Sequence, residues 1–559
     1  DPYNNLTVVF RKQGLFDHVT ISSKKAIDSM IKFIKAQPND SDTYNNLGLA
    51  YFEIDSLDKA VESFEVAVSI NPRFDEAYYN LGVALERLHR FDDAIKAFVS
   101  AENIKTDTEY SLGNILNAKM QSCSWDNFSN LLEKLEKKVN DNKKIVDPFN
   151  LKAWIDDPAL QRKATEIKVN SDFPKNNDLP LTGLYSKHSK IRIGYFSGDF
   201  SEHPVSTLTA ELYEVHNRAH FEIYAFSFGS DTKDDMNLRI KAGVDQFHDV
   251  ESMSHMEIVN LARSLEIDIA VDLSGYTAKA RTDIFAMSVA PIQLSYIGYL
   301  GTMGADYYDY LIADPIMIPK ESQKYYVEKI AYLPCFQVND SKDLPPNLTM
   351  TRKDLGLPET GFVFCCFNNT YKITPTTFDG WARILKSVEG SVLILYANNE
   401  LSKVNLTKEI EQRGVDSSRL ILGESIPKEE YLARYRVADL FLDTHPYNAG
   451  TTASDALKMG LPMLTMKGKS YQARMGASIV NAVNLPELIT HSQEEYESLA
   501  IELASNPDKL KAIKEKLASN LATAPLYDTK LFAKNIESAY TQMYERHHQG
   551  LEPDHIYVE

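Results

Sequence analysis

Residues 439–466 read DLFLDTHPYNAGTTASDALKMGLPMLTM and predict a strand, a helix and a second strand. The runs DLFLD and PMLTM have apolar centres, and the helical run TTASDALKMG lies between them. Strands that are apolar on both faces are typical of a parallel sheet covered by helices on both sides. This stretch therefore predicts an α/β domain with a doubly wound sheet.

The same alternation extends to both sides of this stretch. From residue 191 the apolar runs IRIGYF, FEIYAFSF, IDIAVDLSG, IQLSYIGY, DYLIAD and IAYLP alternate with helical segments, and a second series begins at Gly361. The loop DSKDLPPN at 340–347 divides the two series. We therefore expect two Rossmann-like halves, 191–345 and 346–559, the second ending in an amphipathic helix at 524–545. A ligand of such paired sheets binds between them, at the carboxyl ends of the strands.

Ahead of these halves the sequence repeats itself with an offset of 34 residues, so that Pro38–Asn71 aligns with Pro72–Ile104. The recurring positions are small or aromatic residues: Gly48, Ala60, Phe64 and Ala67 return as Gly82, Ala94, Phe98 and Ala101. Each unit predicts two amphipathic helices and closely resembles a tetratricopeptide repeat. We expect a repeat region at 1–120, followed by a helical connector and linker at 121–190, with the linker itself at 171–188. The repeats offer either a concave surface for polypeptide or a packing module, since the repeat fold alone names no ligand.

Composition narrows the classes of partner. The 559 residues carry 60 Lys and Arg against 78 Asp and Glu, a net charge of −18. Such a chain is a poor partner for nucleic acid or an anionic membrane, and no apolar run is long enough for a membrane helix. Four unpatterned cysteines indicate neither a zinc site nor a disulfide framework. They favour a reducing compartment, and we expect a cytoplasmic protein. Because the chain starts at Asp1 and not at Met, further repeats or a targeting segment ahead of it stay open.

Polar residues follow several predicted strands, where catalytic side chains collect in sheets of this kind. His203 lies in GDFSEHP, directly after IRIGYF. Thr277 lies in SGYTAKAR and Gly304 in GYLGTMG, two loops whose small residues allow a ligand to approach the backbone. The alternatives are a hydrogen-bonded surface histidine and ordinary turns between strands and helices.

Two further stretches predict an anion site. Lys372 follows the apolar run FVFCCF and would place a compact cation in the cleft, unless it is a solvated surface lysine. Thr452–Asp455 has the form of a capping box, and Gly450 before it lets a ligand approach the backbone. A helix N-terminus with free amides attracts anions, although a plain helix cap is the alternative. Together these groups could hold a diphosphate without metal, and neither a P-loop nor a GxGxxG fingerprint is present.

Taken in order, these motifs resemble glycosyltransferase family 41, which contains protein O-GlcNAc transferase and the plant SPINDLY protein O-fucosyltransferase. The resemblance rests on the repeats and on CSWDN, DPFNL, GDFSEHPVS, SGYTAKAR, APIQLSYIGYLGTMGADYYDY, FNNTYKITPTTFDGWARIL and LDTHPYNAGTTASDALKMGLPMLTM. It implies an N-terminal α-solenoid of tetratricopeptide repeats followed by an α/β GT-B fold of two Rossmann-like domains.

The resemblance also implies an inverting, metal-independent glycosyltransferase that moves a sugar from a nucleotide donor to Ser or Thr side chains of proteins. UDP-GlcNAc is the expected donor, and no cofactor or metal is expected. The expected partners are the nucleotide sugar and protein or peptide acceptors guided by the repeat solenoid, with no nucleic acid and no membrane.

Site residues follow from the family motifs. The resemblance implies that Asn369 and Lys372 of F-N-x-x-Y-K bind the donor, with Lys372 on the diphosphate as a catalytic group. It implies that Gly450, Thr451 and Thr452 bind the donor at a helix N-terminus.

The resemblance places other residues around the nucleoside, the sugar and the acceptor. Asp455 would hold the ribose, and Lys428, Tyr431 and Arg434 would lie near the nucleoside. Thr277 and Gly304 would line the donor sugar. His203 would lie by the acceptor, where its pKa range suits deprotonation of a hydroxyl.

Two departures bear on the donor. Ala449-Gly450-Thr451-Thr452 stands where the animal O-GlcNAc enzymes carry Gly-His-Thr-Thr, and SPINDLY proteins also carry Ala-Gly-Thr-Thr. Tyr431 stands where the animal enzymes carry His. A protein O-fucosyltransferase using GDP-fucose is therefore an alternative, as is UDP-glucose as donor, while SGYTAKAR is closer to the O-GlcNAc side. A non-catalytic repeat scaffold with a vestigial cleft is a third interpretation. The short repeat array suggests a bacterial member.

The acidic composition makes a further prediction. A chain of net charge −18 must supply local positive potential to bind an anionic donor. We expect Lys372, Lys428, Arg434 and one helix N-terminus to provide nearly all of it.

Overall fold

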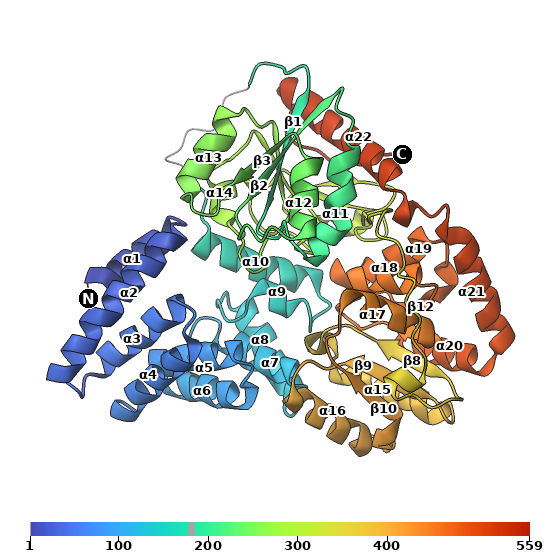
Figure 1. Ribbon diagram of the computed structural model, residues 1–559, viewed down its shortest axis with the longest axis horizontal. Helices are drawn as coiled ribbons and strands as arrows, with labels where there is room; N and C mark the ends of the chain where they lie inside the picture. Colours follow the sequence, from blue (N-terminus) through green and yellow to red (C-terminus); the bar gives the residue numbers. More distant parts are fainter. Residues whose placement is uncertain (1, 177–184) are drawn as a thin grey trace.

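A computed structural model describes residues 2–176 and 185–559, as an elongated helical arm beside two α/β bodies (Figure 1). The central part of the predicted linker, 177–184, lies outside the described residues. None of the helices in the described ranges combines the length and apolar content of a membrane-spanning segment.

The arm consists of paired helices, as the repeats predict. They are α1 (Pro2–Lys12), α2 (Phe16–Ala36), α3 (Ser41–Glu53), α4 (Leu57–Ile70), α5 (Asp75–Arg87) and α6 (Phe91–Ile104). Within each repeat the fully buried ring of Phe64 or Phe98 packs against a glycine of the partner helix. A Cβ at Gly48 would lie 2.5 Å from Phe64, and one at Gly82 would lie 2.6 Å from Phe98. The glycines are thus required by the close approach of the two helices.

The connector links the arm to both bodies. It contains α7 (Ser111–Gln121), α8 (Phe128–Asn140), α9 (Pro148–Leu151) and α10 (Pro158–Asp172). Asp147 and Asp157 cap α9 and α10 by accepting backbone N–H groups, and each precedes a proline at the first helical position. The N-termini of these two helices are therefore fixed by sequence.

The first body is a parallel sheet of order β14-β7-β6-β5-β4-β1-β2-β3. Its strands are β1 (Ile191–Ser197), β2 (Phe221–Ser227), β3 (Gln246–Asp249), β4 (Ile269–Asp272), β5 (Ile292–Ser295), β6 (Tyr310–Ala313), β7 (Lys329–Tyr332) and β14 (Ile556–Tyr557). The helices between them are α11 (Pro204–Val215), α12 (Asp235–Gly243), α13 (His255–Ser264) and α14 (Thr282–Ala286). β4 and β5 are buried along their whole length, as strands of a doubly covered sheet should be.

The second body repeats this plan with the strand order β10-β9-β8-β11-β12-β13. Its strands are β8 (Val363–Cys366), β9 (Val392–Tyr396), β10 (Leu420–Gly423), β11 (Leu440–Leu442), β12 (Met463–Met466) and β13 (Ile489–Thr490). Its helices are α15 (Pro375–Ser387), α16 (Glu400–Gln412), α17 (Lys428–Ala433), α18 (Thr451–Lys458), α19 (Met475–Ala482), α20 (Gln493–Ser505) and α21 (Pro507–Leu521). A helical arm followed by two parallel doubly wound sheets confirms the predicted fold class.

The C-terminal helix does not stay with the second body, to which the sequence analysis assigned it. α22 (Thr529–His548) crosses back and packs on α11 (Figure 1). The strand β14 then joins the first sheet beside β7. Tyr540 of α22 hydrogen-bonds the buried Tyr195 of β1 at 3.2 Å, and Glu537 accepts from His216 at 2.9 Å. The helix crosses because its apolar face completes the cover of the first sheet.

Candidate active site

A cavity of about 860 Å³ lies between the two bodies, where the carboxyl ends of their strands meet. Residues of both bodies and of the connector line it. Seven of the predicted site residues lie on its wall: His203, Thr277, Asn369, Lys372, Gly450, Thr451 and Thr452.

Lys372 is a partly buried cation on the wall of this cavity. It follows β8 in a short 3-10 turn, and its Nζ donates to the carbonyl oxygen of Asn448 at 3.3 Å. The same Nζ lies 4.0 Å from the centroid of the Tyr447 ring. Burial lowers the pKa of Lys372 to about 8, against the opposing charge of Asp443. Burial also raises the pKa of Asp443 to about 7. A lysine held in this way is ready to receive an anion.

The N-terminus of α18 forms the adjacent wall, but not through the predicted capping box. Gly450 is the N-cap, and no side chain caps the helix. Thr452 instead donates its hydroxyl to Oδ1 of Asn368 at 2.6 Å, and Asp455 accepts from the Tyr431 hydroxyl at 3.2 Å. The capping box does not form because the side chains of Thr452 and Asp455 both bond to residues of neighbouring elements. Among the described residues, the amides of Thr451 and Thr452 have no acceptor, which leaves them available to an anion.

Three residues predicted to bind the nucleoside do not line the cavity. They are Tyr431, Arg434 and Asp455, which form a cluster behind this wall. The Tyr431 hydroxyl lies 2.7 Å from that of Tyr435, and burial raises the pKa of Asp455 to about 6. The Arg434 guanidinium stacks 3.6 Å from the ring of Phe367, which itself lines the cavity. These residues support the cavity wall from behind.

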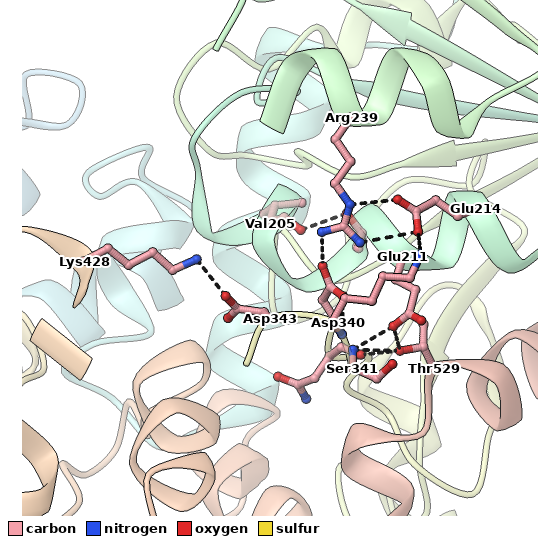
Figure 2. Close-up of polar contacts among 12 residues, drawn as sticks. Val205, Glu211, Glu214, Arg239, Asp340, Ser341, Asp343, Lys428 and Thr529 are labelled. Carbon is pink, nitrogen blue, oxygen red and sulfur yellow. Dashed lines mark hydrogen bonds and ion pairs between the residues drawn. The ribbon is translucent and has the colours of Figure 1, made fainter. Parts of the chain in front are cut away.

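Lys428 and Gly304 also lie outside the cavity wall. Figure 2 shows Lys428 directed toward Asp343 of the inter-body loop, 3.1 Å away. Lys458 donates to the other oxygen of Asp343 at 2.8 Å. Gly304 faces α10, since a Cβ there would lie 3.0 Å from Thr165. The positive charge around the cavity therefore differs from the predicted set.

The first body contributes a loop with a histidine. His203 follows β1 and is the N-cap of α11, where its Nδ1 accepts the backbone N–H of Val205 at 3.3 Å. Asp199 also lines the cavity, with Oδ2 3.8 Å from the same Nδ1. Thr277 lies on the neighbouring loop, its hydroxyl donating to the Ser274 carbonyl at 2.8 Å. Burial lowers the pKa of His203, the charge of Asp199 raises it, and that of Lys279 lowers it.

The connector also contributes to the cavity, which the sequence motifs did not predict. The cavity wall includes Asp147, Phe149, Asn150, Lys168 and Phe173 of the connector, and Lys279 of the first body adds a further cation. Lys168 donates to Asp147 at 2.9 Å. The Asp-Pro signal of α9 could have located a helix N-terminus here, but no spacing in the sequence places the connector in the cleft.

The described residues contain no group of three or more His, Cys, Asp or Glu side chains arranged to hold a metal ion. Metal independence stays a prediction.

Two parallel bodies with a cationic cavity between them define the architecture of GT-B glycosyltransferases. Residues 174–351 and 340–536 match the sequence profile of Glycosyl transferase family 41, and 41–74 and 63–96 match the tetratricopeptide repeat. The chain belongs to glycosyl transferase family 41.

Two curated relatives are longer proteins. The probable UDP-N-acetylglucosamine–peptide N-acetylglucosaminyltransferase SEC of Arabidopsis thaliana is 34% identical over 461 residues, which cover 78% of this chain and 47% of SEC. The UDP-N-acetylglucosamine–peptide N-acetylglucosaminyltransferase of Caenorhabditis elegans is 25% identical over 563 residues, covering 78% of this chain and 49% of that protein. The chain thus spans about half the length of these curated relatives.

A solved structure matches nearly the whole chain. It is a mutant O-GlcNAc transferase of Thermobaculum terrenum, 26% identical, with a TM-score of 0.73 and 98% of both chains covered.

Proposed function

We propose that this protein is an inverting glycosyltransferase that moves GlcNAc from UDP-GlcNAc to Ser or Thr side chains of proteins, without a metal. The observation that carries the proposal is the juxtaposition of the partly buried Lys372 with the free amides at the N-terminus of α18, in a cavity between two Rossmann-like bodies. The names of the relatives in Arabidopsis thaliana, Caenorhabditis elegans and Thermobaculum terrenum support the donor and the protein acceptor.

The chemistry is a single displacement at the anomeric carbon. The acceptor oxygen forms its bond to that carbon while the bond to the diphosphate breaks, and the diphosphate leaves with the electron pair. Negative charge grows on the leaving oxygens, so fixed positive groups there stabilise the transition state more than the ground state. Lys372 and the amides of Thr451 and Thr452 supply those groups, and a proton acceptor near His203 takes the hydroxyl proton.

The acceptor and the compartment belong to the same proposal. The repeat arm joins the cavity through the connector, so we assign it the guidance of polypeptide acceptors. The four cysteines are free and buried, in keeping with a reducing compartment, and we place the protein in the cytoplasm.

A second donor is favoured by one specific feature. Ala449, which precedes Gly450, and Tyr431, which bonds Asp455, both differ from the animal enzymes at positions tied to the nucleotide. GDP-fucose is therefore the competing donor.

A donor panel tests these proposals. The protein is incubated with labelled UDP-GlcNAc, UDP-glucose and GDP-fucose and a lysate, and melting temperature is followed with each unlabelled donor, since a ligand that binds only the native state raises it. We expect label in protein from UDP-GlcNAc, at least 100-fold less with Lys372→Ala, and wild-type labelling with Lys408→Ala, which removes an exposed lysine of α16. If protein were labelled only from GDP-fucose, the donor would be GDP-fucose and the proposed UDP-GlcNAc would be wrong. No label and no donor-induced shift would favour the non-catalytic scaffold.

A further inference from the structure

The tautomer of His203 in this structure is the wrong one for a general base. Its Nδ1 accepts the N–H of Val205 at 3.3 Å, so the neutral ring carries its proton on Nε2. A neutral histidine that donates at Nε2 cannot take a hydroxyl proton there. The ring must exchange this cap for a partner that accepts at Nδ1 before it can serve as a base.

Asp199 is placed to be that partner. Its Oδ2 lies 3.8 Å from Nδ1, and its side chain is only 15% exposed. Among the described residues its carboxylate accepts no hydrogen bond. This is uncommon for a carboxylate with so little solvent exposure.

The backbone around Asp199 is fixed, which leaves only side chains to move. Asp199 N donates to Ser197 Oγ at 3.0 Å, and its carbonyl accepts from Ser206 Oγ at 2.5 Å. Rotation of the imidazole toward the carboxylate, 3.8 Å away, would replace the Val205 N–H as the partner of Nδ1.

We propose that Asp199 is a positioning residue that, with His203, forms a dyad holding the imidazole with its proton on Nδ1 and its Nε2 lone pair free. This inference rests on the proposed function. In the step, the acceptor hydroxyl gives its proton to Nε2 as its oxygen bonds to the anomeric carbon, and the diphosphate leaves with the electron pair of the broken bond. The Asp199 carboxylate accepts from Nδ1 throughout and balances the imidazolium charge. The proton passes to solvent after the product leaves.

The charged groups around His203 predict how kcat/KM depends on pH. Asp199 raises the pKa of His203, whereas burial and Lys279 lower it. Removal of the carboxylate should therefore move the acid limb of kcat/KM, which reports loss of the base on protonation, to lower pH.

The test compares Asp199→Asn with Glu202→Gln, which removes an exposed carboxylate from the same loop and outside the cavity wall. With the donor that the panel identifies and an acceptor peptide, we expect Asp199→Asn to lower kcat by about 100-fold or more, with donor affinity and melting temperature unchanged. Its acid limb should move to lower pH, and Glu202→Gln should match wild type.

A double-mutant cycle separates this role from a structural one. Because Asp199 acts through His203, Asp199→Asn should cost nothing further in a His203→Ala background. Equal losses in both backgrounds, or a wild-type pH profile for Asp199→Asn, would overturn the dyad. Either result would leave the proposed function standing, because wild-type transfer and donor binding are measured in the same experiment.

Discussion

Burial changes the charge that Lys372 carries across the working pH range. Its pKa falls to about 8 because the ammonium has lost most of its water, and Asp443 opposes this fall only in part. In the protein without donor, Lys372 therefore loses its charge progressively as the pH rises through about 8. A diphosphate binds the charged form, so it must draw in a proton when it binds at higher pH.

This gives a prediction for donor affinity. The dissociation constant of the donor should be constant below about pH 7 and rise toward tenfold per pH unit above pH 8, as the lysine loses its proton. Titration calorimetry between pH 6.5 and 9 measures it, and proton uptake should appear at the upper end. In Lys372→Arg the group stays charged, so affinity should be weaker but flat with pH. A wild-type affinity that does not change between pH 7 and 9 would contradict the assignment of Lys372.

Sequence reasoning located the residues of the cavity by their place after buried strands, and it did so for Lys372, Thr451 and His203. It did not locate Lys428, because the direction of that side chain depends on Asp343 in a loop 85 residues earlier. It did not foresee the partners of Thr452 and Asp455 for the same reason. Position in a motif fixes where a backbone runs, whereas tertiary partners fix where a side chain points.

At the scale of elements, the central strands and most helices follow from apolar runs and their spacing. The edge strands do not. β3 is polar and only half-buried, while β13 and β14 have two residues each, too few for any alternation to be visible. The tetratricopeptide repeat was easier to predict than the strands, because its small residues recur at the positions where two helices touch.

The contact between Gly82 and Phe98 predicts that a Gly→Ala substitution, which ordinarily stabilises a helix, will destabilise this one. In a free helix, Gly→Ala stabilises by roughly 1 kcal/mol. Gly82→Ala should instead destabilise the repeat by about 1–3 kcal/mol, because the new methyl group would lie 2.6 Å from the Phe98 ring. Hydrogen exchange of α5 and α6 in the full-length chain measures the local loss. Phe98→Leu added to Gly82→Ala should recover part of it, and faster exchange in the double variant than in either single one would refute steric contact as the cause.

At the scale of the molecule, the repeat arm is attached at both of its ends. At one end the arm continues into α7 of the connector, which meets the second body. There, Thr370 and Asn399 both donate to the carbonyl of Gln121, at 3.0 and 3.1 Å. At the other end the turn between α1 and α2 meets the first body. There, His255 N donates to the Gln13 carbonyl at 2.9 Å, and Arg281 lies 5.0 Å from the Phe16 ring.

Local sequence patterns gave the halves and the repeats but neither this second attachment nor the return of α22. Both depend on surfaces that become complementary only after each body has folded. The loop that ends in Arg281 also lines the cavity through Thr277 and Lys279, so the end of the arm and the wall of the site share one segment. The end of the arm therefore contacts a segment of the first body that also forms part of the cavity wall.

Gly14 is the point at which this attachment of the arm can be disrupted. It has a φ of +74°, and a Cβ there would lie 2.4 Å from the buried His255 ring. Gly14→Val should detach the turn and lower hydrogen-exchange protection in α1 and α2 at least tenfold, with donor-induced stabilisation unchanged. Gly356→Val is the matched control, since Gly356 has a φ of +66° but nothing within 4 Å of its Cβ position. It reproduces the backbone strain without the contact, so equal loss of protection in α1 and α2 in both variants would show that the attachment of the arm does not depend on this contact.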